Sequence, residues 1–352
     1  MARKMRAVVI ARPGGPEVLE MREVPVPILA PGEVLVRVAA SGVNRADLLQ
    51  RMGRYPPPPG FPEDIPGLEF AGVAEEVRGD VGPWEVGAAV MGITGGGGYA
   101  EYVAVPAATL VPVPPSLDLV RAGAVPEVFQ TAFDAVFLQA GLQEGETLLI
   151  HAVGSGVGTA ALQLAQAAGA RVVGTSRTAE KLRRAEELGL SEAILAEPGK
   201  PEVPVRPGGA GASPEARKEV PPWAAEVLRR TDGRGADVIL DLVGGPYLTG
   251  NQRVLARRGR HMVVGVPGGP RAVIDLRALM SARGSITGTV LRARPVEEKA
   301  ELARAFRDRV LPLFDRGALE PVIDRILPAA EAADAHRALE ANETFGKIVL
   351  TW

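Results

Sequence analysis

The chain has 352 residues, a length typical of two domains, and 46% of them are hydrophobic, which is enough to build cores. A formal net charge of −2 offers no basic field to nucleic acid, and no apolar run is long enough to span a membrane. Cysteine is absent, which excludes disulfides and cysteine-liganded zinc. We therefore expect a cytoplasmic protein that binds neither nucleic acid nor a membrane.

The residues before about position 125 predict a β-rich domain, because short apolar runs alternate there with Pro and Gly turn signals. Residues 44–52 predict a helix of one or two turns, and residues 53–59 an extended, proline-stiffened loop that carries Tyr55. The expected strands of this domain cover residues 33–40, 67–77, 87–93, 99–105 and 109–113.

A strand–turn–helix–strand unit occupies residues 147–177. Residues 147–153 form an apolar run typical of a buried parallel strand, and small and apolar residues then recur at helical spacing up to Gly169, the expected C-terminal glycine. Residues 171–175 predict the next strand. This order is the beginning of a dinucleotide-binding fold.

The turn of this unit departs from the G-x-G-x-x-G spelling, and the better frame is A-x-x-S-x-x-G on Ala152, Ser155 and Gly158. Glycines there let backbone N–H groups approach a pyrophosphate at a helix N-terminus, whose partial charge favours anions. The Ser155 hydroxyl is a further candidate for a phosphate oxygen. The alternative is a glycine-rich turn in some other α/β protein, but the flanking strands and helix favour the dinucleotide site.

From about position 126, helices and strands alternate and predict six sheet strands, the later ones over 192–195, 237–242, 260–266 and 285–291. A long helix is expected over 296–316, followed by a β–α–β end that rejoins the first domain. Residues 197–222 are crowded with Pro, Gly and charge and lack periodicity. They predict a flexible surface insertion, with a regulatory or partner arm as the alternative.

The end of the second strand favours NADPH over NADH. Folds that use NAD usually place an acid there for the ribose hydroxyls, whereas here Ser176 and Arg177 follow the strand and the first acid is Glu180. Ser176 and Arg177 can bond a 2′-phosphate, and Lys181 adds a second positive charge. The alternative is that both cations are solvated and that the cofactor choice is loose.

The whole chain outside the insertion resembles the medium-chain dehydrogenase/reductase superfamily. It is most similar to zinc-independent quinone oxidoreductases of the tumour-suppressor-inducible type. The most specific match is NRADLLQ (44–50) followed by YPPPPG (55–60); others are PGLEFAGVA (66–74), HAVGSGVGTAALQLA (151–165) and GKIVL (346–350). The resemblance implies a GroES-like catalytic domain over 1–125 and 292–352, and a Rossmann domain over 126–291.

The resemblance also implies hydride transfer without a metal. Zinc-containing relatives place a Cys where this chain has Asn44 and a His where it has Leu68. Glu69 is present, but one carboxylate does not make a zinc site. The three histidines are far apart in sequence, and packing or surface roles are expected for them.

Site residues carried over from the family fall into two groups. Tyr55 and Asn44 are the expected hydrogen-bond donors to the acceptor oxygen, although Asn44 could equally cap the following helix and Tyr55 could be a surface aromatic. Thr131 could serve only its own helix. The expected cofactor contacts are Asn44, Thr131, Ser155, Gly156, Val157, Gly158, Ser176, Arg177, Lys181, Val264, Gly265, Val266, Gly288, Thr289, Val290 and Asn342.

The reaction expected from the resemblance is reduction of a quinone by NADPH. Two alternatives stay open: an NADPH-dependent reductase of α,β-unsaturated carbonyls, and a non-catalytic NADPH-binding protein. A homodimer, or a higher homo-oligomer, is expected through the apolar edge strand at 285–291.

Overall fold

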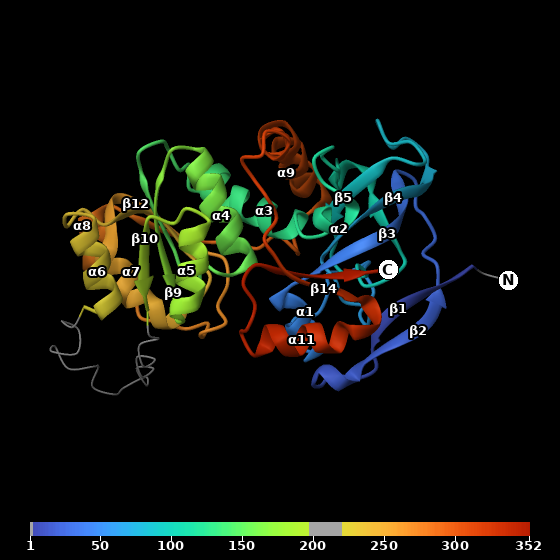
Figure 1. Cartoon of the computed structure of the whole chain (residues 1–352), viewed down its shortest axis with the longest axis horizontal. Helices are drawn as coiled ribbons and strands as arrows, with labels where there is room; N and C mark the ends of the chain where they lie inside the picture. The colour runs from blue at the N-terminus through green and yellow to red at the C-terminus, as the bar shows by residue number, and fades with distance from the viewer. Residues whose placement is uncertain (1–2, 197–219) are drawn as a thin grey trace. The chain divides into compact units, whose positions relative to one another are not determined.

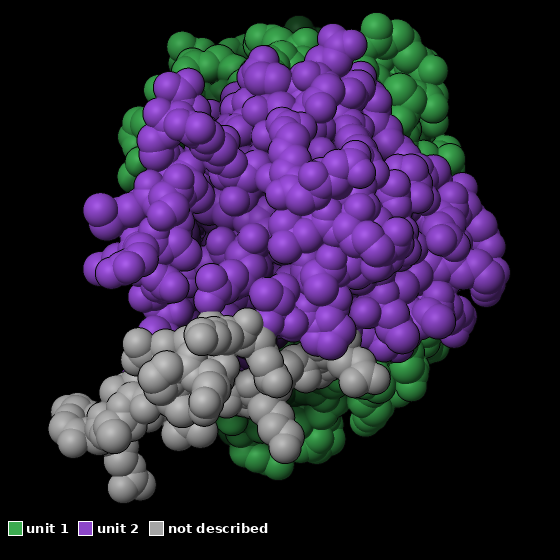
Figure 2. Space-filling model, turned by 90° about the vertical axis from the view of Figure 1, so that its left-hand side faces the viewer, with its two compact units in different colours: residues 1–131, 290–352 green, residues 132–289 purple. Residues whose placement is uncertain are grey.

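A computed structural model of the protein describes residues 3–196 and 220–352 (Figure 1). The chain forms two compact units, residues 1–131 with 290–352 and residues 132–289, which are coloured separately in Figure 2. The expected insertion at 197–222 lies outside the described residues except for its last three. The last of these, Pro222, already begins helix α6 (Pro222–Arg230).

The first unit is built on a seven-stranded sheet with the order β14-β15-β3-β4-β5-β7, to which β6 adds by pairing with β3. Alternate residues Val34, Val36 and Val38 of β3 point into one apolar core, as the two-residue period of a strand requires. A separate antiparallel ribbon pairs β1 (Lys4–Ile10) with β2 (Leu19–Pro25). The sheet strands are β3 (Glu33–Val43), β4 (Glu69–Arg78), β5 (Ala89–Ile93), β6 (Tyr102–Pro106), β7 (Leu110–Pro112), β14 (Ile323–Pro328) and β15 (Lys347–Thr351).

The C-terminal segment belongs to this first sheet, because β15 pairs antiparallel with β3 and parallel with β14. The helix expected over 296–316 is in fact two helices, α9 (Val296–Arg309) and α10 (Leu311–Asp315). Pro312 explains the break, since it has no N–H to donate and fits only the first turn of a new helix. The other helices here are α1 (Arg45–Arg51), α2 (Leu119–Ala122), α3 (Pro126–Phe133) and α11 (Ala332–Glu340).

The second unit contains a six-stranded parallel sheet with the order β10-β9-β8-β11-β12-β13. This is the strand order of a doubly wound dinucleotide-binding sheet, so the predicted α/β fold with a separate β-rich part is confirmed. The strands are β8 (Thr147–Ile150), β9 (Arg171–Ser176), β10 (Glu192–Leu195), β11 (Ala236–Asp241), β12 (Leu255–Val263) and β13 (Ser285–Gly288).

Between these strands run α4 (Gly156–Ala167), α5 (Ala179–Glu187), α6, α7 (Leu248–Val254) and α8 (Leu276–Ala282). Gly169 follows α4 with a φ of 72°, the left-handed conformation expected for a C-terminal glycine.

Two expected strands end early, which corrects the predictions for 260–266 and 285–291. β12 stops at Val263, because the N–H groups of Val264 and Gly265 turn back to the Asp241 carbonyl and a Pro- and Gly-rich loop follows. β13 stops at Gly288, so Thr289 and Val290 lie beyond its end. In the described parts of the chain, no helix combines the length and apolar character needed to cross a membrane.

Candidate active site

Most of the expected cofactor residues in the second unit lie at one edge of its sheet. The strands are parallel, so their carboxyl ends meet at the same edge, where open α/β sheets bind ligands. The residues that follow β8, β9, β12 and β13 are Ser155–Gly158, Arg177, Val264–Val266 and Thr289, while Ser176 and Gly288 are themselves the last residues of their strands.

The turn after β8 has the construction that a phosphate cradle needs. Ser155 is the N-cap of α4, and its Oγ accepts a hydrogen bond of 3.1 Å from the Gly158 N–H. A Cβ at Gly158 would lie 2.6 Å from the carbonyl oxygens of Ala152 and Val153, so only glycine lets the helix begin this close to the strand. The Ser155 hydroxyl therefore holds the turn, and Gly156 and Val157 form the first helical positions.

The end of β9 presents a serine and a cation. Ser176 is buried, and its Oγ accepts a bond of 3.3 Å from the Thr178 N–H. Arg177 is exposed and pairs with no carboxylate in the described part of the chain, while Lys181 lies in the first turn of α5. No carboxylate stands at the strand end itself.

The remaining cofactor residues expected in the second unit differ in exposure and in hydrogen bonding. Val266 is 44% exposed and Gly288 is exposed, whereas the Thr289 Oγ accepts a 2.8 Å bond from Gln139. The fit of this strand edge to a dinucleotide thus rests mainly on the turn after β8 and on the end of β9.

Behind the strand ends lies a buried polar network that the sequence did not reveal. The Asn251 side chain lies 2.6 Å from His151 Nε2 and donates to Asp241, and His261 lies 3.0 Å from the same carboxylate. Burial lowers the pKa of His151 to about 4, so this histidine is neutral at physiological pH. Two histidines 110 positions apart in the chain thus share one buried network, in keeping with the packing roles expected for them.

In the first unit, Asn44 belongs to a buried ion-pair cluster. The Lys347 Nζ lies 2.6 Å from Glu69 Oε1 and donates to Asn44 Oδ1 at 2.7 Å, and both charged side chains are almost fully buried. The Asn44 amide also donates to Glu69 Oε1 at 2.9 Å. Gly42 makes room for this carboxylate, because a Cβ there would lie 2.2 Å from Glu69 Oε1.

These bonds engage the donors of both side chains. The Lys347 ammonium has three N–H groups, and Val43 O, Asn44 Oδ1 and Glu69 Oε1 are three acceptors for them. Asn44 stands at the N-cap position of α1, yet its amide bonds the Gly42 carbonyl and the cluster, while its backbone N–H donates to Asp47. The Asn44 side chain therefore serves this cluster.

Tyr55 is held by Arg292. The guanidinium carbon lies 4.9 Å from the centre of the Tyr55 ring, and Nη1 donates to the Tyr55 carbonyl at 3.0 Å. The same guanidinium donates to Gly95 O at 2.8 Å and to Gln50 Oε1 at 2.5 Å. This half-buried ring is thus fixed by a buried cation, while its hydroxyl makes no hydrogen bond to any described residue.

The other cofactor residues that the sequence predicted in the first unit are far from Asn44 and Tyr55 in the sequence. Thr131 is largely buried in α3, and Asn342 follows α11 with a φ of 56°, a left-handed position that asparagine tolerates. Val290 is 50% exposed.

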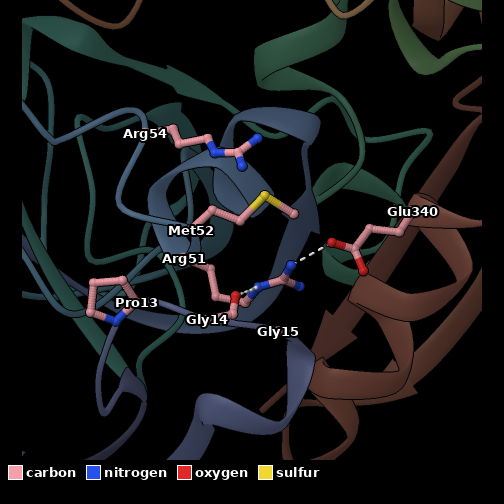
Figure 3. Close-up of a pocket in the computed structure, with 7 residues that line it drawn as sticks. All are labelled: Pro13, Gly14, Gly15, Arg51, Met52, Arg54 and Glu340. Carbon is pink, nitrogen blue, oxygen red and sulfur yellow. Dashed lines mark hydrogen bonds and ion pairs between the residues drawn. The ribbon is translucent and has the colours of Figure 1, made fainter.

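A surface hollow of about 380 Å³ lies elsewhere in the first unit, and none of the expected site residues lines it (Figure 3). Its wall contains the buried Arg51, which donates to the Gly14 carbonyl and pairs with Glu340. The guanidinium also lies 3.2 Å from His336 Nδ1. These groups bond one another, so the side chains at the hollow connect α1, α11 and the loop at Gly14, which is a structural role.

Comparison with known proteins identifies the family. Residues 30–115 match the alcohol dehydrogenase GroES-like domain, and residues 211–350 match a family described as zinc-binding dehydrogenase. The quinone oxidoreductase of Lama guanicoe is 32% identical over 352 residues, which cover 99% of this chain and 98% of the relative. The chain belongs to the quinone oxidoreductases of the medium-chain dehydrogenase/reductase superfamily. It is therefore an oxidoreductase, and its β-rich unit is GroES-like.

Solved structures agree with this assignment. A crystal structure of an NAD-dependent alcohol dehydrogenase is 33% identical, with a TM-score of 0.82, and covers 99% of this chain and 100% of that one. A mycobacterial protein solved with NADPH is 28% identical, with a TM-score of 0.81 and the same coverage. The family supports a nicotinamide cofactor, which the strand edge of the second unit can accommodate.

Two features escaped the sequence reasoning. Lys347 was visible only as part of GKIVL, although a lysine inside a run of apolar strand residues is a signal of a buried ion pair. Glu127, whose backbone N–H donates to Glu69 Oε2 at 2.8 Å, was not singled out at all. Among the described residues, no group of three or more His, Cys, Asp or Glu is arranged to hold a metal ion.

The buried ion pair predicts a large cost for removing one partner. Lys347→Met leaves the Glu69 charge buried without a counter-charge, so we expect the free energy of unfolding to fall by about 3–5 kcal/mol, measured by urea denaturation. The double variant Glu69→Gln/Lys347→Met is expected to be more stable than the single variant, because the orphaned charge is gone.

The matched control is Lys4→Met. Lys4 and Glu23 form an ion pair of 3.4 Å in the same unit, but both side chains are about two-thirds exposed, so a change within about 0.5 kcal/mol is expected. If the two lysine substitutions lowered the free energy of unfolding equally, burial of the Lys347–Glu69 pair would make no difference to stability.

Proposed function

We propose that the protein reduces quinones with NADPH and without a metal ion. The observation that carries this proposal is the strand edge of the second unit, whose turn at Ser155–Gly158 suits a dinucleotide, in a chain of the quinone oxidoreductase family. Asn44 and Leu68 stand where zinc-containing relatives have ligands. The printed names of the relatives support a quinone as the acceptor.

In this proposal each group of residues has a defined task. When bound, NADPH supplies a hydride. The turn at Ser155–Gly158 holds the pyrophosphate, and Ser176, Arg177 and Lys181 hold the adenosine phosphate. Further contacts with the cofactor come from the segments 264–266 and 288–290. The side chains of Asn44, Thr131 and Asn342 also contact it. Tyr55, which is fixed by Arg292, donates its free hydroxyl to the acceptor oxygen.

Steady-state oxidation of NADPH against a panel of quinones and α,β-unsaturated carbonyls tests this function. We expect the highest kcat/KM with quinones, unchanged after dialysis against EDTA. A preference for alkenals or enoyl thioesters would identify the enone reductase instead. Flat traces with every acceptor, together with tight NADPH binding, would identify a non-catalytic binding protein, and loss of activity with EDTA would refute the metal-free reaction.

The cofactor preference rests on the end of β9. Ser176→Asp combined with Arg177→Ala places a negative charge where the 2′-phosphate would lie and removes a cation. We expect the KM for NADPH to rise at least tenfold, equivalent to about 1.4 kcal/mol, while the KM for NADH stays level or falls. The matched control is Arg183→Ala, which removes an exposed arginine on α5 that pairs with Glu187. A wild-type protein that uses both cofactors equally would refute the preference.

We also propose a homodimer through β13. This strand is the edge of the six-stranded sheet, and the neighbouring α8 has no buried residue, with Leu276 and Met280 66% and 76% exposed. Pairing with the same strand of a second copy would cover this sheet edge, and the exposed apolar side chains of α8, by an isologous contact. Leu276→Glu/Met280→Glu is expected to reduce the mass in light scattering from dimer to monomer at micromolar concentration.

The control for the dimer is Ile28→Glu, because Ile28 is 90% exposed in the other unit and should leave the mass unchanged. A wild-type protein that is monomeric at the same concentration would contradict the proposal directly.

A further inference from the structure

Reduction of a quinone consumes a proton as well as a hydride, and the ion-pair cluster of Asn44, Glu69 and Lys347 has a neighbour, Glu127, whose carboxyl group has no other assignment. Glu127 lies in the first turn of α3, directly after Pro126, with which the helix begins. Its side chain is partly buried and makes no hydrogen bond or ion pair with any described residue, whereas its backbone N–H is bonded to Glu69. The carboxyl group is therefore available for another partner.

The surroundings of Glu127 connect it to the cluster. Its charge acts on Tyr55, on Arg292 and on Lys299 of α9, and it is itself under the influence of Asp47, Glu69 and Lys347. The Lys299 ammonium donates to the Arg292 carbonyl at 2.7 Å, so a cation whose charge acts on Glu127 also braces the Arg292–Tyr55 contact. Glu127 thus belongs to the same neighbourhood as the proposed donor Tyr55.

A second side chain on α3 has polar atoms that make no hydrogen bond to a described residue. The side chain of Gln130 is fully buried, and neither its nitrogen nor its oxygen bonds a described residue. It lies three residues after Glu127, and such positions share one face of a helix. An unsatisfied buried amide is costly, so a polar partner is expected beside it. Glu127 and Gln130 thus place two polar side chains three positions apart on α3.

We propose that Glu127 is the proton donor of the reaction. This inference rests on the proposed quinone reduction. The quinone accepts two electrons and one hydrogen as a hydride from the reduced nicotinamide, and one of its oxygens takes the proton of the Glu127 carboxyl, so that the product is the hydroquinone. The Glu127 carboxylate then recovers a proton from solvent, to which its partial exposure gives access.

The charge balance around Glu127 supports a carboxyl that is protonated at neutral pH. Burial, followed by the negative charge of Glu69, raises the pKa of Glu127 to about 8; Asp47 adds to the rise, and Lys347 and Lys299 oppose it. The N-terminal position on α3 also favours the charged form, but such a partly exposed helix terminus contributes less than these effects. A general acid must carry its proton at the working pH, and this carboxyl meets that requirement.

The test is Glu127→Gln, which keeps the shape of the side chain and removes the acid. For the wild type, kcat/KM with a quinone should fall as the pH rises through about 8, because the acid loses its proton there. For the variant, we expect kcat at pH 6.5 to be about 100-fold lower and the decline near pH 8 to be absent. NADPH affinity, measured by fluorescence titration, should be unchanged.

The matched control is Glu301→Gln, an exposed glutamate on α9 of the same unit, which should alter none of these quantities. Equal kcat for wild type and Glu127→Gln, or a pH decline that survives the substitution, would overturn the proposal. A melting temperature close to that of the wild type at pH 6.5 would show that the loss of turnover is not a loss of folding.

A measurement without turnover separates this inference from the proposed function. Infrared difference spectra of the protein alone, at pH 7.5 against pH 9.5, should show the C=O band of a protonated carboxylic acid that disappears in Glu127→Gln; burial raises the pKa of Asp47 only to about 6, so Asp47 is ionised at both pH values. If the wild type reduces no acceptor, the proposed function fails, and the proton-donor role fails with it, whatever the band shows. If quinones are reduced but the band is present in the variant, Glu127 is not the proton-holding group.

Discussion

The buried contact between Lys347 and Glu69 is the constraint on which the ion-pair cluster of the first unit depends. Neither charge is tolerable alone at this burial, since an uncompensated buried ion costs several kcal/mol. Together they connect β15, β4, the N-terminus of α1 through Asn44 and the start of α3 through the Glu127 N–H. One ion pair therefore fixes the positions from which Asn44 and Glu127 extend.

The same arrangement bears on the proposed reaction without a metal. A cation is present, but its N–H groups are directed at Val43, Asn44 and Glu69. Lys347 consequently stabilises the scaffold and offers little to a substrate oxygen. In the proposed reaction, assistance to the acceptor therefore comes from a group whose polar hydrogen is not bonded to a described residue, and the Tyr55 hydroxyl is such a group.

The sequence predicted the fold well and the site only in part. Local signals were sufficient to predict the six parallel strands and the turn at Ser155–Gly158. The hydrophobic period, the glycine spacing and the capping residues that indicate them all lie within about thirty residues of one another. Errors arose where a proline restarted a helix at Pro312 and where β12 ended at Val263. Lys347 was missed because its partner Asn44 is 303 positions away, and no local pattern reports such a contact.

Contacts between residues far apart in the sequence also set the pKa of Glu127. A carboxyl with the usual pKa near 4.3 would be ionised at neutral pH and could not donate a proton. Burial and the neighbouring Glu69 shift the pKa of Glu127 to about 8. The oxygen of a reduced quinone resembles a phenol, whose pKa is about 10, so proton transfer from Glu127 to that oxygen is favourable. Lys347 limits the shift, because its charge stabilises the carboxylate that forms. The ion pair thus keeps Glu127 acidic enough to donate the proton and basic enough to hold it until the acceptor arrives.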